Sequence, residues 1–207
     1  MRALSIEMMV TACALAWSLA PAAEPERPDG NQAAARIAEE VCSRCHGPAA
    51  QNASPLVPVI AGQQRSYLAW QLRAYKIGFR DDPQAHQRMW GQVAGADDSL
   101  IDSVAAYYAS LPARAGIAAD AASAAAGRRL YEGGAPAKDV TACSACHGTD
   151  AEGDGIFPRL AGQNAEYFIR QLSLIQDNLR NIGIMHSTVQ KLSPAEMKDL
   201  AVYLQSK

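Results

Sequence analysis

The chain carries two copies of a short motif in which two cysteines, three positions apart, are followed directly by a histidine. The copies are Cys42-Ser43-Arg44-Cys45-His46 and Cys143-Ser144-Ala145-Cys146-His147. Two thiols on one helical turn can each form a thioether with a vinyl group of haem, and the next residue then places an imidazole beneath the iron. The spacing therefore predicts two covalently bound haem c groups, with the four cysteines as attachment points and His46 and His147 as iron ligands.

Paired cysteines also occur in redox-active disulfides and in zinc sites. A thioredoxin-like pair is expected in a βαβ context, and the sequence shows no convincing alternation of apolar and polar residues that would predict strands. One zinc ion held by all four cysteines would have to join pairs that 97 residues separate, far more than the usual spacing. Neither alternative explains why a histidine follows both pairs, so covalent haem is the preferred interpretation.

Two methionines occupy equivalent positions in the two halves of the chain. Met89 lies 43 residues after His46, and Met185 lies 38 residues after His147. Thioether sulfur suits ferrous iron and raises the reduction potential relative to a second histidine. Met89 and Met185 are therefore the predicted sixth ligands of the two irons, whereas Met197 falls on the apolar stripe of a helix and is expected to pack in a core.

The remaining histidines, His86 and His186, are rival candidates for the sixth position. When the two halves are aligned, His86 faces Ile182 and His186 faces Trp90, so neither histidine recurs. Because the methionine recurs and the histidines do not, the sequence favours histidine–methionine ligation at both irons.

A proline follows each motif at nearly the same distance, Pro58 twelve residues after His46 and Pro158 eleven residues after His147. A backbone carbonyl at these positions could accept a hydrogen bond from the N–H of the imidazole and fix the orientation of the ring. The alternative is that the prolines only shape a loop. We expect the carbonyl role for both.

The repeat extends well beyond the motifs and divides the chain into two halves. The matched segments are Pro58–Gln63 with Pro158–Gln163, Tyr67, Gln71 and Leu72 with Tyr167, Gln171 and Leu172, and Val104–Tyr107 with Leu200–Tyr203. Each copy spans roughly 80–90 residues, the size of a small domain. We expect an N-terminal domain at 23–112, a linker at 113–120 and a C-terminal domain at 121–207.

Apolar residues recur at helical spacing throughout both copies. In the first copy such positions are Ala34, Ile37, Ala38 and Val41, then Tyr67, Leu68, Leu72, Tyr75 and Phe79. Ser193 and Glu196 form the pattern of a capping box at the start of the last helix, and Asp97 holds the cap position in the first copy. The predicted fold class is all-α, with two tandem domains.

The first 22 residues are typical of an export signal that is cleaved. Met1-Arg2 gives a positive start, residues 3–20 are mostly apolar, and Ala20-Pro21-Ala22 fits the cleavage pattern. A retained membrane anchor is the first alternative, but the apolar run after Glu7 is too short to span a bilayer comfortably. Lipidation at Cys13 is the second. Export predicts a periplasmic protein that keeps only the four motif cysteines.

The composition restricts the classes of partner. The chain has 19 lysines and arginines against 21 acidic residues, a net charge of −2 and no basic stripe, so no nucleic-acid partner is expected. Aromatic residues make up only 6 % of the chain. Two small domains with so few large side chains are expected to depend on a bound group for their cores.

Together these features resemble the cytochrome c4 family, periplasmic di-haem cytochromes built from two class I cytochrome c domains. The resemblance covers nearly the whole chain after the export signal and rests on both motifs, both Pro-x-x-Ala-Gly-Gln segments, Met89, Met185 and the segment from Gly127 to Gly134. It implies two mostly helical cytochrome c-like domains, each built around one haem and related by pseudo-twofold symmetry. It also implies histidine–methionine ligation and electron transfer between a quinol-oxidising complex and a terminal oxidase.

The expected function is that of a periplasmic carrier of single electrons between respiratory partners, without catalysis of its own and with loose membrane association left open. One alternative is a di-haem cytochrome subunit of an enzyme that oxidises sulfur compounds, such as a flavocytochrome sulfide dehydrogenase. Another is a di-haem enzyme that oxidises thiosulfate itself. The latter favours a cysteine or an open sixth position at one iron, and the exported chain has no spare cysteine.

Overall fold

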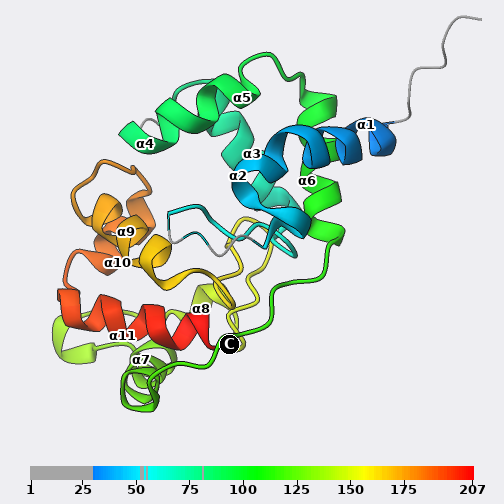
Figure 1. Cartoon of the computed structure of the whole chain (residues 1–207). Coiled ribbons are helices and arrows are strands. Elements are labelled where there is room, and N and C mark those ends of the chain that lie inside the picture. The colour runs from blue at the N-terminus through cyan, green and yellow to red at the C-terminus, as the bar shows by residue number, and fades with distance from the viewer. Residues whose placement is uncertain (1–29, 52–53, 55, 81) are drawn as a thin grey trace, which may run out of the picture.

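The computed structural model describes residues 30–51, 54, 56–80 and 82–207, and the predicted signal peptide at 1–22 lies outside them. Within these ranges the chain forms helices and two isolated β-bridges, Ala135 with Val140 and Asp154 with Phe157, and no β-strand. No helix in the described part is long and apolar enough to cross a membrane. The predicted all-α fold class is confirmed, and Figure 1 shows two helical halves joined by an extended segment.

The N-terminal half contains three longer helices and several short turns. Its elements are α1 (Gly30–Ile37), the π-helix η1 (Ala38–Cys42), α2 (Ser43–His46), the 3₁₀ turn η2 (Pro48–Ala50), α3 (Arg65–Lys76), α4 (Pro83–Ala85), the π-helix η3 (His86–Trp90), α5 (Gly91–Val93) and α6 (Asp98–Ser110). Helix α6 packs against both α1 and α3.

The C-terminal half repeats this plan with fewer breaks. Its elements are α7 (Ala121–Gly133), the 3₁₀ turn η4 (Pro136–Lys138), α8 (Ser144–His147), α9 (Ala165–Gln176), α10 (Gly183–Val189) and α11 (Pro194–Gln205). Helix α11 packs against α7 and α9, as α6 packs against α1 and α3 in the first half. The two copies in the sequence therefore fold in the same way.

The predicted caps of the last helix in each copy are confirmed. The carboxylate of Asp97 accepts a hydrogen bond from the backbone N–H of Leu100 at 2.8 Å. At the start of α11, Ser193 accepts from the N–H of Glu196, and the Glu196 carboxylate accepts from the N–H of Ser193 at 2.7 Å. These bonds satisfy backbone donors that a helix start otherwise leaves without partners.

Two predicted helices differ in detail from the structure. The segment that leads into the first motif is α-helical only as far as Ile37 and continues as the π-helix η1 to Cys42. Phe79, which fitted the apolar spacing of α3, lies beyond the end of that helix and is 52 % exposed. The helix ends before it because Gly78 adopts a φ of 72°, a left-handed conformation that terminates helices.

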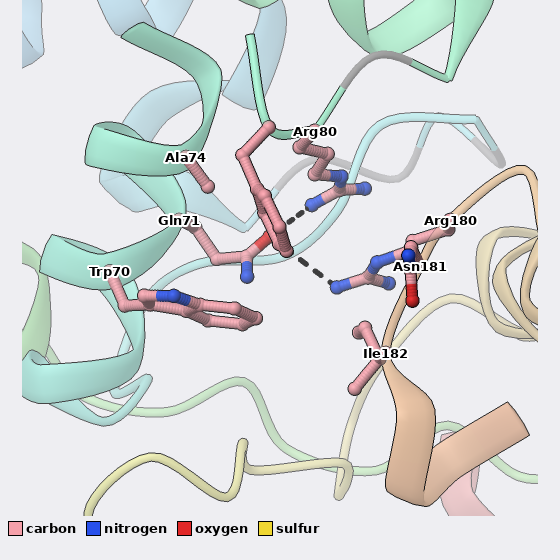
Figure 2. A pocket seen from close by; sticks show the side chains of 8 residues that line it. Trp70, Gln71, Ala74, Arg80, Arg180, Asn181 and Ile182 are labelled. Carbon is pink, nitrogen blue, oxygen red and sulfur yellow. Dashed lines mark hydrogen bonds between the residues drawn. The ribbon is translucent and has the colours of Figure 1, made fainter. Parts of the chain in front are cut away.

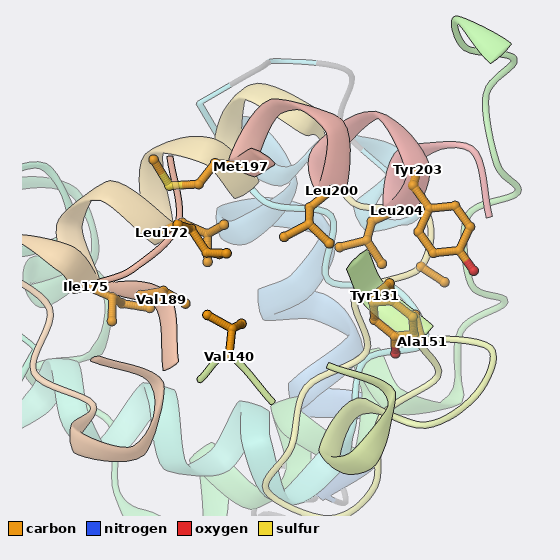
Figure 3. Close-up of a cluster of buried hydrophobic side chains, with 12 residues drawn as sticks. Tyr131, Val140, Ala151, Leu172, Ile175, Val189, Met197, Leu200, Tyr203 and Leu204 are labelled. Carbon is orange, nitrogen blue, oxygen red and sulfur yellow. The ribbon is translucent and has the colours of Figure 1, made fainter. Parts of the chain in front are cut away.

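Each half has its own buried core. In the C-terminal half, Tyr131 from α7 meets Leu200, Tyr203 and Leu204 from α11, and Met197 extends the same cluster (Figure 3). Met197 is only 4 % exposed, so its predicted core position is confirmed. The core of the N-terminal half consists largely of alanines, namely Ala34, Ala38, Ala50, Ala61, Ala69 and Ala105. Such small side chains fill little volume, which fits a domain that depends on a bound group.

The connection between the halves lies against the protein surface. It runs from the end of α6 at Ser110 to the start of α7 at Ala121 (Figure 1). Arg114 donates to the side-chain oxygen of Asn164 at 2.7 Å, and the N–H of Ile117 donates to the carbonyl of Gln205 at 3.0 Å. We retain the boundaries 23–112, 113–120 and 121–207 as a proposal.

Candidate haem-binding sites

Both cysteine–histidine motifs form a single helical turn. Cys42 is the last residue of η1, and Cys45 and His46 follow in α2. In the second half Cys143 is the cap residue of α8, which contains Cys146 and His147. Within the described residues neither cysteine pair is joined by a disulfide bond. The local geometry is therefore the one that covalent attachment of haem requires, with two thiols and an imidazole on one turn.

Each motif histidine is held by the carbonyl of the proline that the sequence singled out. The Nδ1–H of His46 donates to the carbonyl of Pro58 at 3.0 Å, and that of His147 donates to the carbonyl of Pro158 at 2.9 Å. Because a carbonyl oxygen can only accept, Nδ1 must carry the proton, and in a neutral ring Nε2 is left with its lone pair. This arrangement prepares Nε2 as a metal ligand.

The unsatisfied nitrogen of His147 shows that the second site fits an iron. Nε2 of His147 is buried and has no hydrogen-bond partner among the described residues. Burial lowers the pKa of both His46 and His147, and the hydrogen bonds to the proline carbonyls oppose this shift. The net effect keeps both rings neutral, which is the form that binds a metal.

The thiols do not have the properties of a redox-active pair. Burial raises the pKa of the Cys42 thiol and raises that of Cys143 to about 11. A reactive cysteine pair needs the opposite shift, towards the thiolate. No group of three or more histidine, cysteine, aspartate and glutamate side chains able to hold a metal ion occurs in the described ranges, so the four cysteines do not form one zinc site.

The predicted sixth ligands lie in short helices rather than in loops. Met89 is partly buried in η3, which packs on α3. Met185 is partly buried in α10 and packs against the C-terminal core. The structure therefore places each motif histidine next to its proline. That Met89 and Met185 bind the irons together with these histidines stays a prediction.

The rival histidines have other contacts. His86 is exposed and stacks on Trp90, with the ring centroids 5.8 Å apart. The Nδ1 of His186 is hydrogen-bonded to the carbonyl of Ile175 near the end of α9, at 2.8 Å. Neither contact recurs in the other half.

Sequence reasoning missed a polar cluster between the two halves. Figure 2 shows Arg80 and Arg180 both donating to the side-chain oxygen of Gln71. The side-chain oxygen of Gln171 also accepts from both, from Arg80 at 2.8 Å and from Arg180 at 2.7 Å. Arg80 also pairs with the buried carboxylate of Asp82 at 3.1 Å. The signal was present, since the glutamines recur in both copies at positions that an apolar core does not explain.

A second set of contacts joins the halves closer to the motifs. Gln63 and Gln163, which end the repeated Pro-x-x-Ala-Gly-Gln segments, each bond to the backbone of the opposite half. Both side chains are buried. Repeated residues thus form the interface between the halves as well as the two sites. This interface, with Gln63, Gln163 and their backbone partners Val59 and Arg159, is called the seam below.

Comparison with known proteins identifies the family of each half. The family model described as Cytochrome c matches residues 32–112 and again 124–207. The fold and the two sites define a protein of two tandem cytochrome c domains.

The chain is 35 % identical over 187 residues to cytochrome c4 of Azotobacter vinelandii. The aligned region covers 85 % of this chain and 89 % of that protein. The solved structure of cytochrome c4 from Acidithiobacillus ferrooxidans matches with a TM-score of 0.77 and 35 % identity, over 80 % of this chain and 98 % of the other. A thiosulfate dehydrogenase electron acceptor of Thiomonas intermedia is 32 % identical over 79 % of this chain and 76 % of that protein. The chain belongs to the cytochrome c4 family. It holds two covalently bound haem c groups and transfers electrons.

Proposed function

We propose that the chain is a periplasmic di-haem carrier that passes single electrons between respiratory partners, towards a terminal oxidase. One haem is attached to Cys42 and Cys45 and the other to Cys143 and Cys146. The observation that carries this proposal is the paired histidine–proline bonding, with Nε2 of His147 left buried and without a partner.

The chain would contribute two ligands to each iron. His46 and His147 would hold the iron of a bound haem through Nε2, and Met89 and Met185 would supply sulfur as the further ligand. Bound haem c provides reversible one-electron oxidation and reduction of its iron. With both of these ligands in place, no position at the iron would be open to a substrate, which would suit a carrier better than an enzyme.

Respiratory partners are supported by membership of the cytochrome c4 family. The test mixes the matured protein with membranes that contain a quinol-oxidising complex or a terminal oxidase. We expect reduction by the first in the presence of quinol and rapid oxidation by the second in the presence of oxygen, followed in the visible spectrum. Failure of both exchanges, with both haems present, would remove the respiratory role.

A second candidate role is electron acceptance from a sulfur-oxidising enzyme. Its specific support is the likeness to the thiosulfate dehydrogenase electron acceptor of Thiomonas intermedia. A purified thiosulfate dehydrogenase with thiosulfate should then reduce both haems, and co-purification with a flavin-containing chain would point to a sulfide-oxidising complex instead. Reduction by quinol-linked membranes alone favours the first role.

Export is part of the proposal and has its own test. N-terminal sequencing of the protein from a periplasmic fraction should begin close to residue 23. Recovery of the full chain from the cytoplasm, with residues 1–22 retained, would contradict export.

A further inference from the structure

The two glutamines that end the repeated segments reach across the seam in a crossed pattern. Gln163 of the C-terminal half accepts from the N–H of Val59 and donates to the carbonyl of Val59, both at 2.9 Å. Gln63 of the N-terminal half accepts from the N–H of Arg159 at 2.7 Å and donates to its carbonyl at 3.0 Å. Each side-chain amide therefore forms two bonds with one residue of the opposite half.

The target of each glutamine adjoins the carbonyl that holds the motif histidine. The carbonyl of Pro58 and the N–H of Val59 belong to one peptide unit. Its oxygen accepts from Nδ1 of His46, and its N–H donates to Gln163. In the same way, the unit between Pro158 and Arg159 accepts from His147 and donates to Gln63. Two chains of hydrogen bonds thus run from a histidine of one half to a glutamine of the other.

Such a chain affects the electronic character of the imidazole. A peptide that donates through its N–H becomes a stronger acceptor at its oxygen, because successive hydrogen bonds polarise one another in a low-dielectric surrounding. A stronger acceptor at Nδ1–H makes the imidazole a more basic metal ligand. Gln63, Gln163 and Val59 are at most 9 % exposed and Arg159 is partly buried, so water screens the chain through Val59 least.

The second partner of each glutamine keeps its oxygen in place. The N–H of Gln64 donates to Gln63 and the N–H of Asn164 donates to Gln163, both at 2.9 Å. Each amide oxygen therefore accepts two backbone N–H groups, one from its own half and one from the other. These bonds fix the orientation of both amides.

We propose that Gln63 and Gln163 are positioning residues that tune the haem of the opposite domain through the peptide unit that holds its histidine. The inference rests on the proposed ligand roles of His46 and His147. Gln163 acts on the N-terminal haem and Gln63 on the C-terminal haem. The reduction potential of each haem consequently depends on the domain that does not bind it.

The test replaces each glutamine by methionine, which has a similar length and no amide. Gln163→Met should raise the potential of the N-terminal haem, because a less basic imidazole stabilises ferric iron less. Gln63→Met should raise that of the C-terminal haem. The potential of each haem is measured by a redox titration that is monitored by NMR. The variants Cys42→Ser and Cys143→Ser serve to assign the NMR signals to the two haems.

The matched control is Gln64→Met. Gln64 also reaches across the seam, where it donates to the carbonyls of Glu152 at 2.9 Å and Gly153 at 3.1 Å. These carbonyls do not accept from the ring of a motif histidine, so loss of the contact should leave both potentials unchanged. Hydrogen exchange at the N–H of Val59 should become faster in Gln163→Met and stay unchanged in Gln64→Met.

The outcomes separate this inference from the proposed function. A visible spectrum of the unaltered, matured protein that does not show two haems would overturn the proposed function. The crossed tuning would be overturned by any of three results in a variant that keeps both haems. These are a shift in the potential of the haem in the substituted domain, equal shifts in both potentials, and no shift in either. If Gln163→Met does not fold, Gln163→Asn, which is too short to reach Val59, should give the same upward shift in the N-terminal haem alone.

Discussion

A hydrogen bond from Nδ1 determines which nitrogen of each motif histidine can bind iron. The bonds from His46 to Pro58 and from His147 to Pro158 leave Nε2 as the donor atom at both sites. The sequence allowed this pairing to be expected, since each proline follows its histidine within a dozen residues. It did not allow Gln63 and Gln163 to be placed beside these peptides, because those contacts span 96 and 104 residues.

At the same scale, replacing the sixth ligand should affect one haem only. Met89→His should lower the potential of the N-terminal haem by a sizeable part of the roughly 0.8 V range that axial ligands span. The potential of the C-terminal haem should stay nearly constant. Redox titration with visible spectra gives both values. Equal shifts at both haems would contradict the assignment of Met89.

The control for that experiment is Met197→Leu. Met197 is 4 % exposed in the core and lies on α11, so its replacement by an apolar residue of similar volume should leave both potentials unchanged. The weak near-infrared band of methionine-bound ferric haem should remain in Met197→Leu and decrease in Met89→His.

At the scale of elements, the contact between α7 and α11 organises the C-terminal domain. Gly127 allows α7 to lie against the backbone of α11, since a Cβ at this position would be 2.0 Å from the carbonyl oxygen of Asp199. Gly127→Ala should therefore lower the free energy of unfolding by about 1–3 kcal/mol. Gly133→Ala, on the same helix with no neighbouring atom within 4 Å, should have no cost or a small gain. Urea unfolding compares the two variants, and equal losses would contradict the packing argument.

The cap of α11 links this element to acid stability. Hydrogen bonds from Lys138 and Ser193 lower the pKa of Glu196 to about 2. A carboxyl with a lowered pKa stabilises the folded state above its unfolded value of about 4.3, and this contribution is lost as the pH falls towards 2. Glu196→Gln should cost about 1 kcal/mol at pH 7 and less at pH 3, as measured by urea unfolding. An equal cost at both values would show that the carboxylate charge is not involved.

Helix propensity and spacing explain which elements could be predicted. The capped helices α6 and α11 begin where their side chains specify, because capping is local in the sequence. The π-helical turns η1 and η3, and the exposure of Phe79, depend on the packing of the rest of the domain. Apolar periodicity alone does not distinguish them from a continuous α-helix.

At the scale of the whole molecule, a buried polar cluster joins the two domains. Arg80 and Arg180 are each 7 % exposed and share the side-chain oxygens of Gln71 and Gln171, and Arg180 also donates to Tyr67 at 2.8 Å. The repeat places identical glutamines, one from each domain, in the same cluster. A single domain considered by itself would leave them without an explanation.

Removal of one member of this cluster should destabilise the pair of domains. Arg80→Leu leaves the carboxylate of Asp82, which is 3 % exposed, without its guanidinium partner. Loss of one partner of a buried ion pair costs about 3–5 kcal/mol. Arg128→Leu is the matched control, because Arg128 pairs with Glu132 at the surface and is 65 % exposed. It should leave the urea midpoint almost unchanged, and a similar loss in both variants would contradict a special role for the cluster.

The intact mass of the matured protein under denaturing conditions tests the account most directly. Thioether bonds survive denaturation, so we expect the mass of the polypeptide that begins near residue 23 plus two haem groups. A polypeptide mass without haem, or with one haem only, from cells that mature other c-type cytochromes would contradict covalent attachment at both motifs.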